Sequence, residues 1–391
     1  TNKDAPKNKV VKYDTKTGLF TDVISEASDV LTSVSISNNK FLVQYMVDAN
    51  DKIFVYDLNG SWITELPLPT FGTVSGFSAN KDEDVIFFTF ASFLYPSVIM
   101  KYDIANNKMS VYRESEIKFD ASKYETKQVF YMSKDGTKVP MFIVHKKGLK
   151  IDRNNPALLY GYGGFNASMK PSFSTSNIIL LENGGVYALA NIRGGGEYGK
   201  EWHMSGTKLD KQNVFDDFIA AGEYLINQGY TSSKYLAVEG GSNGGLLVGA
   251  VINQRPELFR VAFPAVGVMD MLRYQKFTIG WAWVTDYGSS EESEEQFKYL
   301  LSYSPYHNLK EGLNYPATMV TTSDHDDRVV PAHSFKYAAR LQEVYKGDNP
   351  VIIRVEVNAG HGSGRPTKMI IEAVTDKWAF MFYNMGITPL Y

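Results

Sequence analysis

The pattern of apolar and polar positions divides the chain into two parts with different periods. Residues 1–117 contain short segments, such as residues 40–47 and 85–89, in which apolar and polar side chains tend to alternate. This alternation is typical of strands that bury one face. From about residue 120, short apolar runs are separated by longer amphipathic segments, which predicts strands that alternate with helices.

The first part also repeats itself. A run of apolar residues that ends in Tyr-Asp occurs at residues 10–14, 53–57 and 98–103, and a polar turn follows each copy. The Tyr-Asp pairs lie 43 and 46 residues apart. A β-rich repeat of this length is typical of propeller blades. A plain β-meander could give similar hairpins by chance, but three near-matching copies favour the propeller.

The repeat also bears on how much of a propeller the chain contains. Residues 1–117 supply about two to three blades at this period, whereas closed propellers have roughly four to eight. Each blade buries its apolar face only against its neighbours. We therefore expect further blades of the same protein to precede Thr1.

The second part predicts a sheet covered by helices. Its predicted strands are residues 128–132, 139–144, 157–160, 185–191, 235–238, 262–266, 317–321 and 351–357. Its clearest helices are residues 213–227, 334–344 and 367–383. Strand–helix alternation indicates a mostly parallel sheet with helices on both faces, and with its active loops at the carboxyl ends of the strands. We therefore expect an α/β fold: an α/β-hydrolase domain over residues 118–391, preceded by a partial β-propeller over residues 1–117.

A glycine-rich turn lies at the centre of this second part. Residues 240–245 read Gly-Gly-Ser-Asn-Gly-Gly and separate a predicted strand from a predicted helix. A serine between glycines at such a turn is the nucleophile elbow, where the sharp backbone leaves no room for side chains beside the serine. The helix that follows points its free N–H groups at the serine oxygen. The motif alone is equally compatible with an ordinary tight turn, so its context decides.

Candidates for an acid and a base follow Ser242 in the order that an α/β-hydrolase requires. One loop after a predicted strand holds Asp324, Asp326 and Asp327, and any of the three can be the acid. Of the six histidines, only His361 lies in the loop after the last predicted strand. Alone, these residues could belong to a turn or a helix cap. In this order and on these loops, they favour a serine hydrolase.

Donors for a negatively charged carbonyl oxygen can also be predicted. An oxyanion needs hydrogen-bond donors that are in place before it forms. The backbone N–H of Asn243 is one candidate. The second is the loop of residues 161–165, Gly-Tyr-Gly-Gly-Phe, in which Tyr162 offers a phenol and the glycines permit a close approach.

Other functional classes fit less well. Residues 194–200 have the spacing of a phosphate-binding loop, but Glu201 replaces the required Ser or Thr, so we do not expect nucleotide binding. A net charge of −3 implies no basic face for nucleic acid. The absence of cysteine excludes disulfides, thiolate catalysis and cysteine-ligated zinc. Residues 85–100 are too short and too interrupted to span a membrane. We expect no metal and no other cofactor.

Taken together, the motifs resemble the prolyl oligopeptidase family, also called prolyl endopeptidases. The likeness covers the whole second domain, whereas the propeller part matches in architecture with weaker motifs. It rests on residues 160–166, 191–199, 240–245, 324–331 and 360–362. The resemblance also implies that this chain begins inside the family's propeller and lacks the family's N-terminal segment.

The resemblance implies an activity and assigns the catalytic residues. It implies a cytoplasmic serine endopeptidase that hydrolyses short peptides on the carboxyl side of proline through an acyl-enzyme. Ser242 would be the nucleophile, Asp326 the acid and His361 the base. The hydroxyl of Tyr162 and the N–H of Asn243 would bind the oxyanion. It further implies a monomer whose partners are short proline-containing peptides, with the propeller as a size filter.

The resemblance also implies a pocket for the substrate proline, in which the indole of Trp283 stacks on the ring. A flat indole and apolar walls suit a rigid pyrrolidine, with a contact energy on the order of 1 kcal/mol. Arg328 would bind a substrate carbonyl. The remaining residues that it places in the pocket are Phe165, Asn243, Val268, Tyr287 and Val329.

Other hypotheses remain beside this one. Peptide macrocyclases share the scaffold and its motifs, so the acceptor of the acyl group could be an amine of the same peptide. A catalytically inactive peptide-binding scaffold is a further alternative, although an intact set of Ser242, Asp326, His361 and Tyr162 argues against it. Cleavage after Arg or Lys is less favoured, because the pocket around Trp283 offers a cation no carboxylate.

Overall fold

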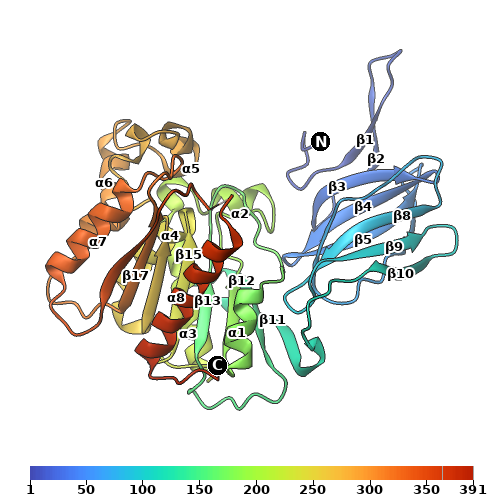
Figure 1. The fold of residues 1–391 in the computed structure, drawn as a ribbon. Coiled ribbons are helices and arrows are strands. Elements are labelled where there is room, and N and C mark those ends of the chain that lie inside the picture. Colours follow the sequence, from blue (N-terminus) through green and yellow to red (C-terminus); the bar gives the residue numbers. More distant parts are fainter. Residues whose placement is uncertain (363, 391) are drawn as a thin grey trace. The chain divides into compact units, whose positions relative to one another are not determined.

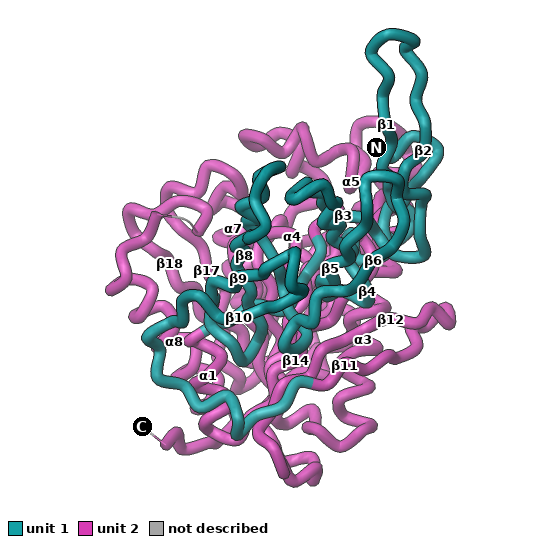
Figure 2. The backbone as a smooth tube through the Cα atoms, turned by 90° about the vertical axis from the view of Figure 1, so that its right-hand side faces the viewer, with its two compact units in different colours: residues 1–126, 168–174, 196–202 teal, residues 127–167, 175–195, 203–391 magenta. Residues whose placement is uncertain are grey.

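A computed structural model describes residues 1–362 and 364–390, and the chain forms two compact units, coloured separately in Figure 2. The first unit contains residues 1–126, 168–174 and 196–202. The second contains residues 127–167, 175–195 and 203–391. Of the helices that the described residues form, none combines the length and the apolar character needed to cross a bilayer.

The first unit consists of antiparallel β-structure (Figure 1). Its described residues form one hairpin and two four-stranded sheets. The hairpin pairs β1 (Val10–Tyr13) with β2 (Phe20–Ile24). One sheet has the order β3 (Val30–Ser37), β4 (Lys40–Val47), β5 (Asn50–Asp57), β6 (Trp62–Glu65). The other has the order β10 (Lys108–Arg113), β9 (Val98–Asp103), β8 (Val85–Ala91), β7 (Thr73–Ser75). Four-stranded antiparallel sheets in series are propeller blades, as the repeat predicted.

The alternating pattern and the Tyr-Asp repeat each have a structural cause. In β8, Ile86, Phe88 and Phe90 are buried in the apolar core that the two blades share, while their neighbours are less buried. The aspartate of the repeat closes the turn after its strand. Asp57, for example, accepts backbone N–H groups from Asn59 and Ser61, both at 2.8 Å. Such turns bring the next strand back antiparallel.

The second unit is built on an eight-stranded sheet within the described residues. Its order is β11 (Tyr124–Met132), β12 (Lys138–Lys146), β14 (Val186–Ala190), β13 (Ala157–Tyr160), β15 (Leu236–Gly241), β16 (Val261–Ala265), β17 (Ala317–Ser323), β18 (Val351–Glu356). From β14 to β18 neighbouring strands pair parallel, and β12 pairs antiparallel with β14. The mostly parallel sheet was predicted from the alternation of strands and helices. Its strands are short apolar runs, which are typical of strands buried on both faces.

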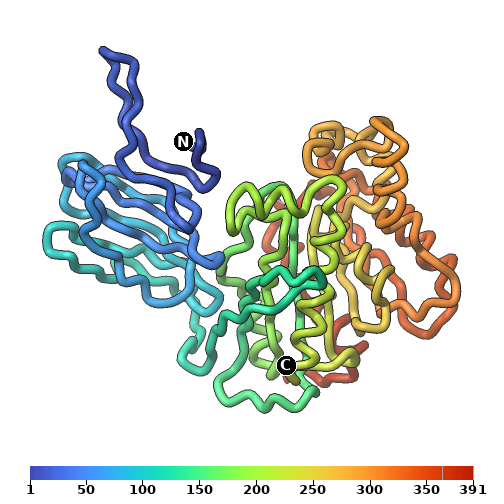
Figure 3. Tube along the Cα trace, turned by 180° about the vertical axis from the view of Figure 1, so that it is seen from behind, coloured from blue at the N-terminus to red at the C-terminus, as the bar shows by residue number. Residues whose placement is uncertain are grey.

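Helices cover this sheet, which gives the α/β-hydrolase arrangement predicted from the sequence. On the face nearer the viewer in Figure 1, α1 (Thr175–Glu182) packs with α8 (Thr367–Met385). On the other face, seen in Figure 3, α3 (Gln212–Asn227) packs with α4 (Asn243–Gln254). The carboxyl ends of the parallel strands meet at one edge, where the loops carry the predicted site residues.

Four helices of the structure were not predicted. They are α2 (Lys200–Met204), α5 (Val284–Tyr287), α6 (Glu294–Tyr303) and α1. The helix α7 (Ala332–Val344), which was predicted, packs against β17 and β18. The helices α2 and α5 are too short to show an apolar period, so a pattern search has little to detect in them.

Candidate active site

Ser242 lies at the turn between β15 and α4, where the sequence placed the elbow. Its backbone has φ of +59° and ψ of −114°, a conformation that costs a non-glycine residue about 1–3 kcal/mol. The turn is held by backbone bonds: Ser242 N–H donates to the carbonyl of Ala265 at 2.9 Å, and Gly245 N–H donates to the carbonyl of Ser242 at 2.9 Å. A Cβ atom on Gly240 would lie 2.4 Å from the carbonyl oxygen of Gly244, so this position requires glycine.

The structure distinguishes the three aspartates of the loop after β17. Asp326 is buried, and its Oδ1 accepts the backbone N–H groups of Arg328 at 3.0 Å and Val329 at 2.9 Å. Its Oδ2 lies 2.6 Å from Nδ1 of His361. Asp324 instead pairs with the exposed ring of His325, and Asp327 is exposed. Among the three, Asp326 therefore has the contacts of a residue that orients a catalytic histidine.

The bond to Asp326 fixes one nitrogen of His361. When Nδ1 donates to the carboxylate, Nε2 of a neutral ring is left as a proton acceptor. Across the described residues, however, no hydrogen bond joins His361 to Ser242. The acid and the base are therefore paired in this structure, whereas the base is not bonded to the nucleophile.

Tyr162 lies close to the nucleophile. It follows β13, and the side chain of Ser242 is near enough to lower the pKa of its phenol. Burial raises the pKa of Tyr162, the charge of Asp286 raises it further, and Arg328 and Ser242 oppose this only in part. The phenol therefore keeps its proton at neutral pH and can donate it in a hydrogen bond.

The aromatic residues predicted for the pocket form one cluster. The ring of Phe165 lies edge-on to Trp283 and Tyr287, with centroid distances of 6.5 Å and 5.3 Å. Tyr274, which the sequence did not single out, is stacked on Trp283 at 6.3 Å and lies edge-on to Tyr287 at 5.2 Å. Such an array provides flat apolar walls for a small ring.

The other predicted pocket residues lie on loops at the carboxyl end of the sheet. Val268 follows β16 and Val329 follows β17, and both are buried. Arg328 is exposed. Its guanidinium is near enough to the phenol of Tyr162 for its positive charge to lower the pKa of that phenol.

Sequence reasoning missed the charged groups beneath this cluster. Lys211 is buried just before α3, and its Nζ donates to the carbonyl of Gly163 at 2.8 Å and to Oδ1 of Asn243 at 3.2 Å. Asp286 is also buried, and it accepts the backbone N–H of Phe165 at 3.2 Å. A lysine beside a polar stretch normally indicates a solvated helix end, so the sequence carries no signal for its burial.

His203 belongs to the same set of missed residues. Its Nε2 lies 2.7 Å from Oδ1 of Asp286. The contact gives the buried carboxylate a second partner besides the N–H of Phe165. Buried carboxylates require such partners, because an unpaired buried charge is costly.

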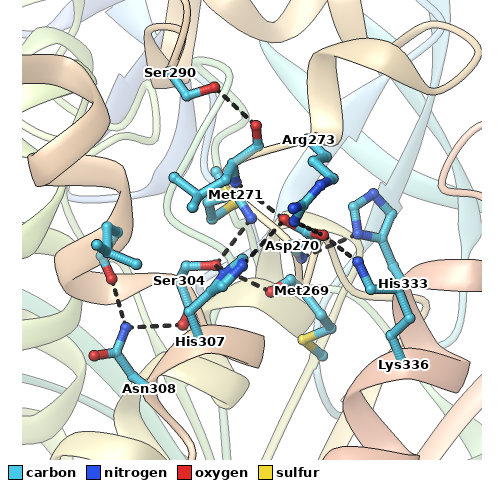
Figure 4. Close-up of polar contacts among 12 residues, drawn as sticks. Met269, Asp270, Met271, Arg273, Ser290, Ser304, His307, Asn308, His333 and Lys336 are labelled. Carbon is cyan, nitrogen blue, oxygen red and sulfur yellow. Dashed lines mark hydrogen bonds and ion pairs between the residues drawn. The ribbon is translucent and has the colours of Figure 1, made fainter. Parts of the chain in front are cut away.

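A second buried polar cluster lies at the start of α7, close to the loop that carries Asp326. Figure 4 shows Asp270 between Lys336 and Arg273, which both pair with its carboxylate, while its backbone N–H donates to Nδ1 of His333 at 3.1 Å. Burial raises the pKa of Asp270, but the bond with Lys336 and the charges of Lys336, His307 and Arg273 together more than offset this and hold the pKa low. Burial lowers the pKa of His333 to about 4, so its ring is neutral at pH 7.

The glycine-rich loop at residues 194–200 has a structural explanation that involves no phosphate. Arg193, just before it, is buried and pairs with Asp217 at 2.6 Å. Within the loop, Glu197 accepts the backbone N–H of Met169 at 2.8 Å. In the part of the chain that the structure describes, no group of three or more His, Asp or Glu residues could hold a metal ion.

Comparison with known proteins gives consistent results along the whole chain. A profile described as the Prolyl oligopeptidase family matches residues 171–388, and one described as the Prolyl oligopeptidase N-terminal beta-propeller domain matches residues 1–115. A prolyl endopeptidase of Elizabethkingia meningoseptica is 52% identical over 393 residues, which cover 100% of this chain and 56% of that protein. These matches agree with the predicted fold class.

Solved structures show the same likeness. One from a structural and mechanistic analysis of two prolyl endopeptidases has a TM-score of 0.95 and 42% identity, covering 99% of this chain and 58% of that one. Another is prolyl oligopeptidase B from Galerina marginata, bound to a 35mer hydrolysis and macrocyclization substrate. It has a TM-score of 0.94 and 38% identity, covering 99% and 56%. The chain thus spans a little over half the length of these relatives.

Proposed function

The chain belongs to the prolyl oligopeptidase family, and from this premise we propose that it is the catalytic part of a serine endopeptidase that cleaves short peptides after proline. The observation that carries the proposal is the pairing of Asp326 with His361 at 2.6 Å, on the loops that follow β17 and β18. The elbow that holds Ser242 follows β15 of the same sheet. This is the chain order of nucleophile, acid and base in the α/β-hydrolase fold.

The reaction follows from the chemistry of these groups. Oγ of Ser242 attacks the carbonyl carbon of the peptide bond after proline, and its proton passes to Nε2 of His361. Asp326 holds the imidazolium that forms. The N–H of Asn243 and the hydroxyl of Tyr162 bind the oxyanion. His361 then protonates the departing amine, which leaves an ester on Ser242, and water hydrolyses this ester by the same steps.

The aromatic cluster supports the proposed specificity. Trp283, Phe165 and Tyr287 offer flat walls, and Trp283 keeps part of its surface exposed for a substrate. Val268 and Val329 complete the proposed lining, and Arg328 is the proposed ligand of a substrate carbonyl. An apolar aromatic pocket favours a pyrrolidine ring, which packs against its walls. It disfavours a cationic side chain, which would lose its hydration there without gaining a carboxylate partner.

One alternative has support of its own. The Galerina protein, similar in structure at a TM-score of 0.94, is described with a substrate of hydrolysis and macrocyclization. On this scaffold the acyl group would pass from Ser242 to the amino group of the same peptide instead of to water. The catalytic residues are the same in both reactions, so only the product separates them.

Further parts of the proposal concern the whole protein. We propose a division into a partial propeller over residues 1–117 and a hydrolase domain over residues 118–391, which the two family profiles support with matches to residues 1–115 and 171–388. A monomeric state, a cytoplasmic location and short proline-containing peptides as partners also belong to the proposal. They rest on the family resemblance.

A pair of matched substrates tests the proposal. The purified chain is given two blocked chromogenic peptides that differ only in having proline or arginine before the leaving group. We expect release of the chromophore from the proline peptide and at least about tenfold less from the arginine peptide. Mass spectrometry of a longer proline peptide then separates linear from cyclic product. Equal rates for both peptides, or no turnover of either, would contradict the proposed activity.

A further inference from the structure

Lys211 occupies an unusual place for a lysine. Its side chain is 1% exposed, within the second unit, at the end of the segment that leads into α3. Among the described residues, no carboxylate lies within ion-pair distance of its ammonium. Burial of an ammonium without a carboxylate partner is costly. The contacts that the ammonium does make therefore indicate what it does for the protein.

The two acceptors of Lys211 belong to the two segments that supply the proposed oxyanion donors. One acceptor, the carbonyl of Gly163, directly follows Tyr162. The other is Oδ1 of Asn243, whose own backbone N–H is the second donor. The ammonium thus connects the loop after β13 to the first residue of α4.

The side chain of Asn243 also joins these two segments through its own hydrogen bonds. Its Nδ2 donates to the carbonyl of Tyr162, and its Oδ1 also accepts the hydroxyl of Tyr287 at 2.9 Å. Packing there is tight, because a Cβ atom on Gly164 would lie 2.7 Å from Nδ2 of Asn243. A small displacement of the Lys211 side chain would therefore shift both oxyanion donors.

The charge of the ammonium responds to its surroundings. Burial lowers the pKa of Lys211 to about 8, and the negative charge of Asp286 on α5 opposes this. The other titratable groups that face this region are His203, which is paired with Asp286, and the phenols of Tyr162 and Tyr287. Burial raises the pKa of both phenols, so neither of them ionises near pH 8.

We propose that Lys211 is a positioning residue for the oxyanion hole: by holding the carbonyl of Gly163 and the side chain of Asn243, it sets the Tyr162 hydroxyl and the Asn243 N–H at the spacing that the transition state requires. The inference rests on the proposed function. Misplaced donors bind the oxyanion less well but leave the aromatic pocket in place, so the loss should fall on kcat rather than on KM.

The first test is Lys211→Met, which keeps the length of the side chain and removes its donors. With the chromogenic proline peptide we expect kcat to fall about 10- to 100-fold while KM changes less than about threefold, as for the weakening of an oxyanion donor. Lys336→Met is the matched control. This lysine pairs with the buried Asp270 and, within the described residues, makes no hydrogen bond or ion pair with either oxyanion segment, so the kcat of the variant should stay within about threefold of wild type.

A double-mutant cycle with Tyr162→Phe separates positioning from a general structural effect. If Lys211 acts through the Tyr162 hydroxyl, Lys211→Met should lower kcat much less in the Tyr162→Phe background than in the wild-type background. Equal fold-losses in both backgrounds, or an unchanged kcat in the single variant, would overturn the inference and leave the proposed function intact. A wild-type chain without turnover would overturn both.

A second measurement covers the case in which Lys211→Met does not fold. Loss of the ammonium charge weakens its hydrogen bonds, so wild-type kcat should decline as pH rises through about 8. The decline should be clearly smaller in Tyr162→Phe, which lacks the donor that Lys211 positions. The same decline in both proteins, or none in wild type, would refute the role of Lys211.

Discussion

The nucleophile side and the base side of the candidate site are built differently. On the nucleophile side, the side chain of Asn243 is bonded to Lys211, Tyr287 and the backbone of Tyr162. The phenol of Tyr162 lies near enough to Ser242 for that side chain to lower its pKa. On the base side, the carboxylate of Asp326 is bonded to two backbone N–H groups and to His361, but within the described residues His361 makes no hydrogen bond to Ser242.

The difference indicates a division of labour between the two sides. Donors that are fixed before the substrate arrives cost no reorganisation when the oxyanion forms. A base can be completed later, since catalytic hydrogen bonds are often long or absent without substrate and tighten in the complex.

The largest effect should come from Ser242→Ala, which removes the group on which both sides act. The covalent path is lost, so we expect kcat to fall on the order of 10⁴- to 10⁶-fold with an unchanged melting temperature. Ser302→Ala, on the exposed face of α6, is the control and should keep full activity. A purified Ser242→Ala protein with a tenth of wild-type activity would show that the nucleophile lies elsewhere.

Tyr162→Phe removes a hydrogen-bond donor from the nucleophile side and leaves the Asp326–His361 pair unchanged. Loss of one oxyanion donor should lower kcat by roughly 10- to 1000-fold with little effect on KM. Tyr160→Phe is a matched control two residues earlier in the same segment, and we expect it to change kcat less than about threefold. The comparison of the two sides would fail if Tyr162→Phe raised KM and left kcat unchanged, because Tyr162 would then serve only in binding.

Trp283→Ala tests the pocket and should have a smaller effect. Stacking contributes only where the substrate has a ring, at about 0.5–1.5 kcal/mol, which is up to about tenfold in kcat/KM. We expect this loss for a proline peptide and a smaller one for its alanine counterpart. Trp281→Ala is the control, since Trp281 lies in the same short helical turn but is 65% exposed. Equal losses for both peptides would place Trp283 outside the specificity pocket.

The buried polar cluster around Asp270 and His333 allows a prediction about stability. His333 is neutral when folded, with its pKa lowered to about 4, whereas in the unfolded chain it takes up a proton below about pH 6.5. The unfolded state therefore binds more protons between these values, and stability falls as the pH decreases through this window. At pH 5 the loss from this group is about 2 kcal/mol relative to pH 7.

His333→Asn removes this titration and keeps an acceptor for the N–H of Asp270. Urea unfolding at pH 7 and pH 5 should show wild type losing about 2 kcal/mol more than the variant. His325→Asn, at an exposed position, should behave as wild type. If wild type and His333→Asn lost equal stability, the neutral ring would not be the cause. Activity at pH 7 should be unchanged in both variants.

The sequence predicted much of the fold because the relevant signals are local. The strand predicted at residues 85–89 and the apolar run at 235–238 each correspond to a strand, β8 and β15. The elbow and the order of Ser242, Asp326 and His361 could be predicted because loops at the carboxyl ends of parallel strands meet at one edge. What local patterns could not show is which of three neighbouring aspartates is buried, a matter of tertiary contacts.

The buried charged residues beneath the aromatic cluster could not be predicted from the sequence for a related reason. Asp286 lies far along the chain from His203 and Lys211, none of the three belongs to a motif, and buried charges are rare, so no local pattern indicates their burial. Tyr274 likewise joins the aromatic cluster only through folding. Only the tertiary contacts of Asn243 and Phe165 connect these residues to the site.

The most direct test of the central claim, that Ser242 forms an acyl-enzyme through the carbonyl of a substrate proline, is covalent capture by a substrate mimic. A blocked peptidyl diphenyl phosphonate with a proline analogue reacts with an activated serine, forming a Ser–O–P bond and releasing phenol. We predict one adduct, located on Ser242 by peptide mass mapping, that forms at least about tenfold faster than with the arginine analogue. No adduct, an adduct on another residue, or equal rates with both reagents would contradict the account.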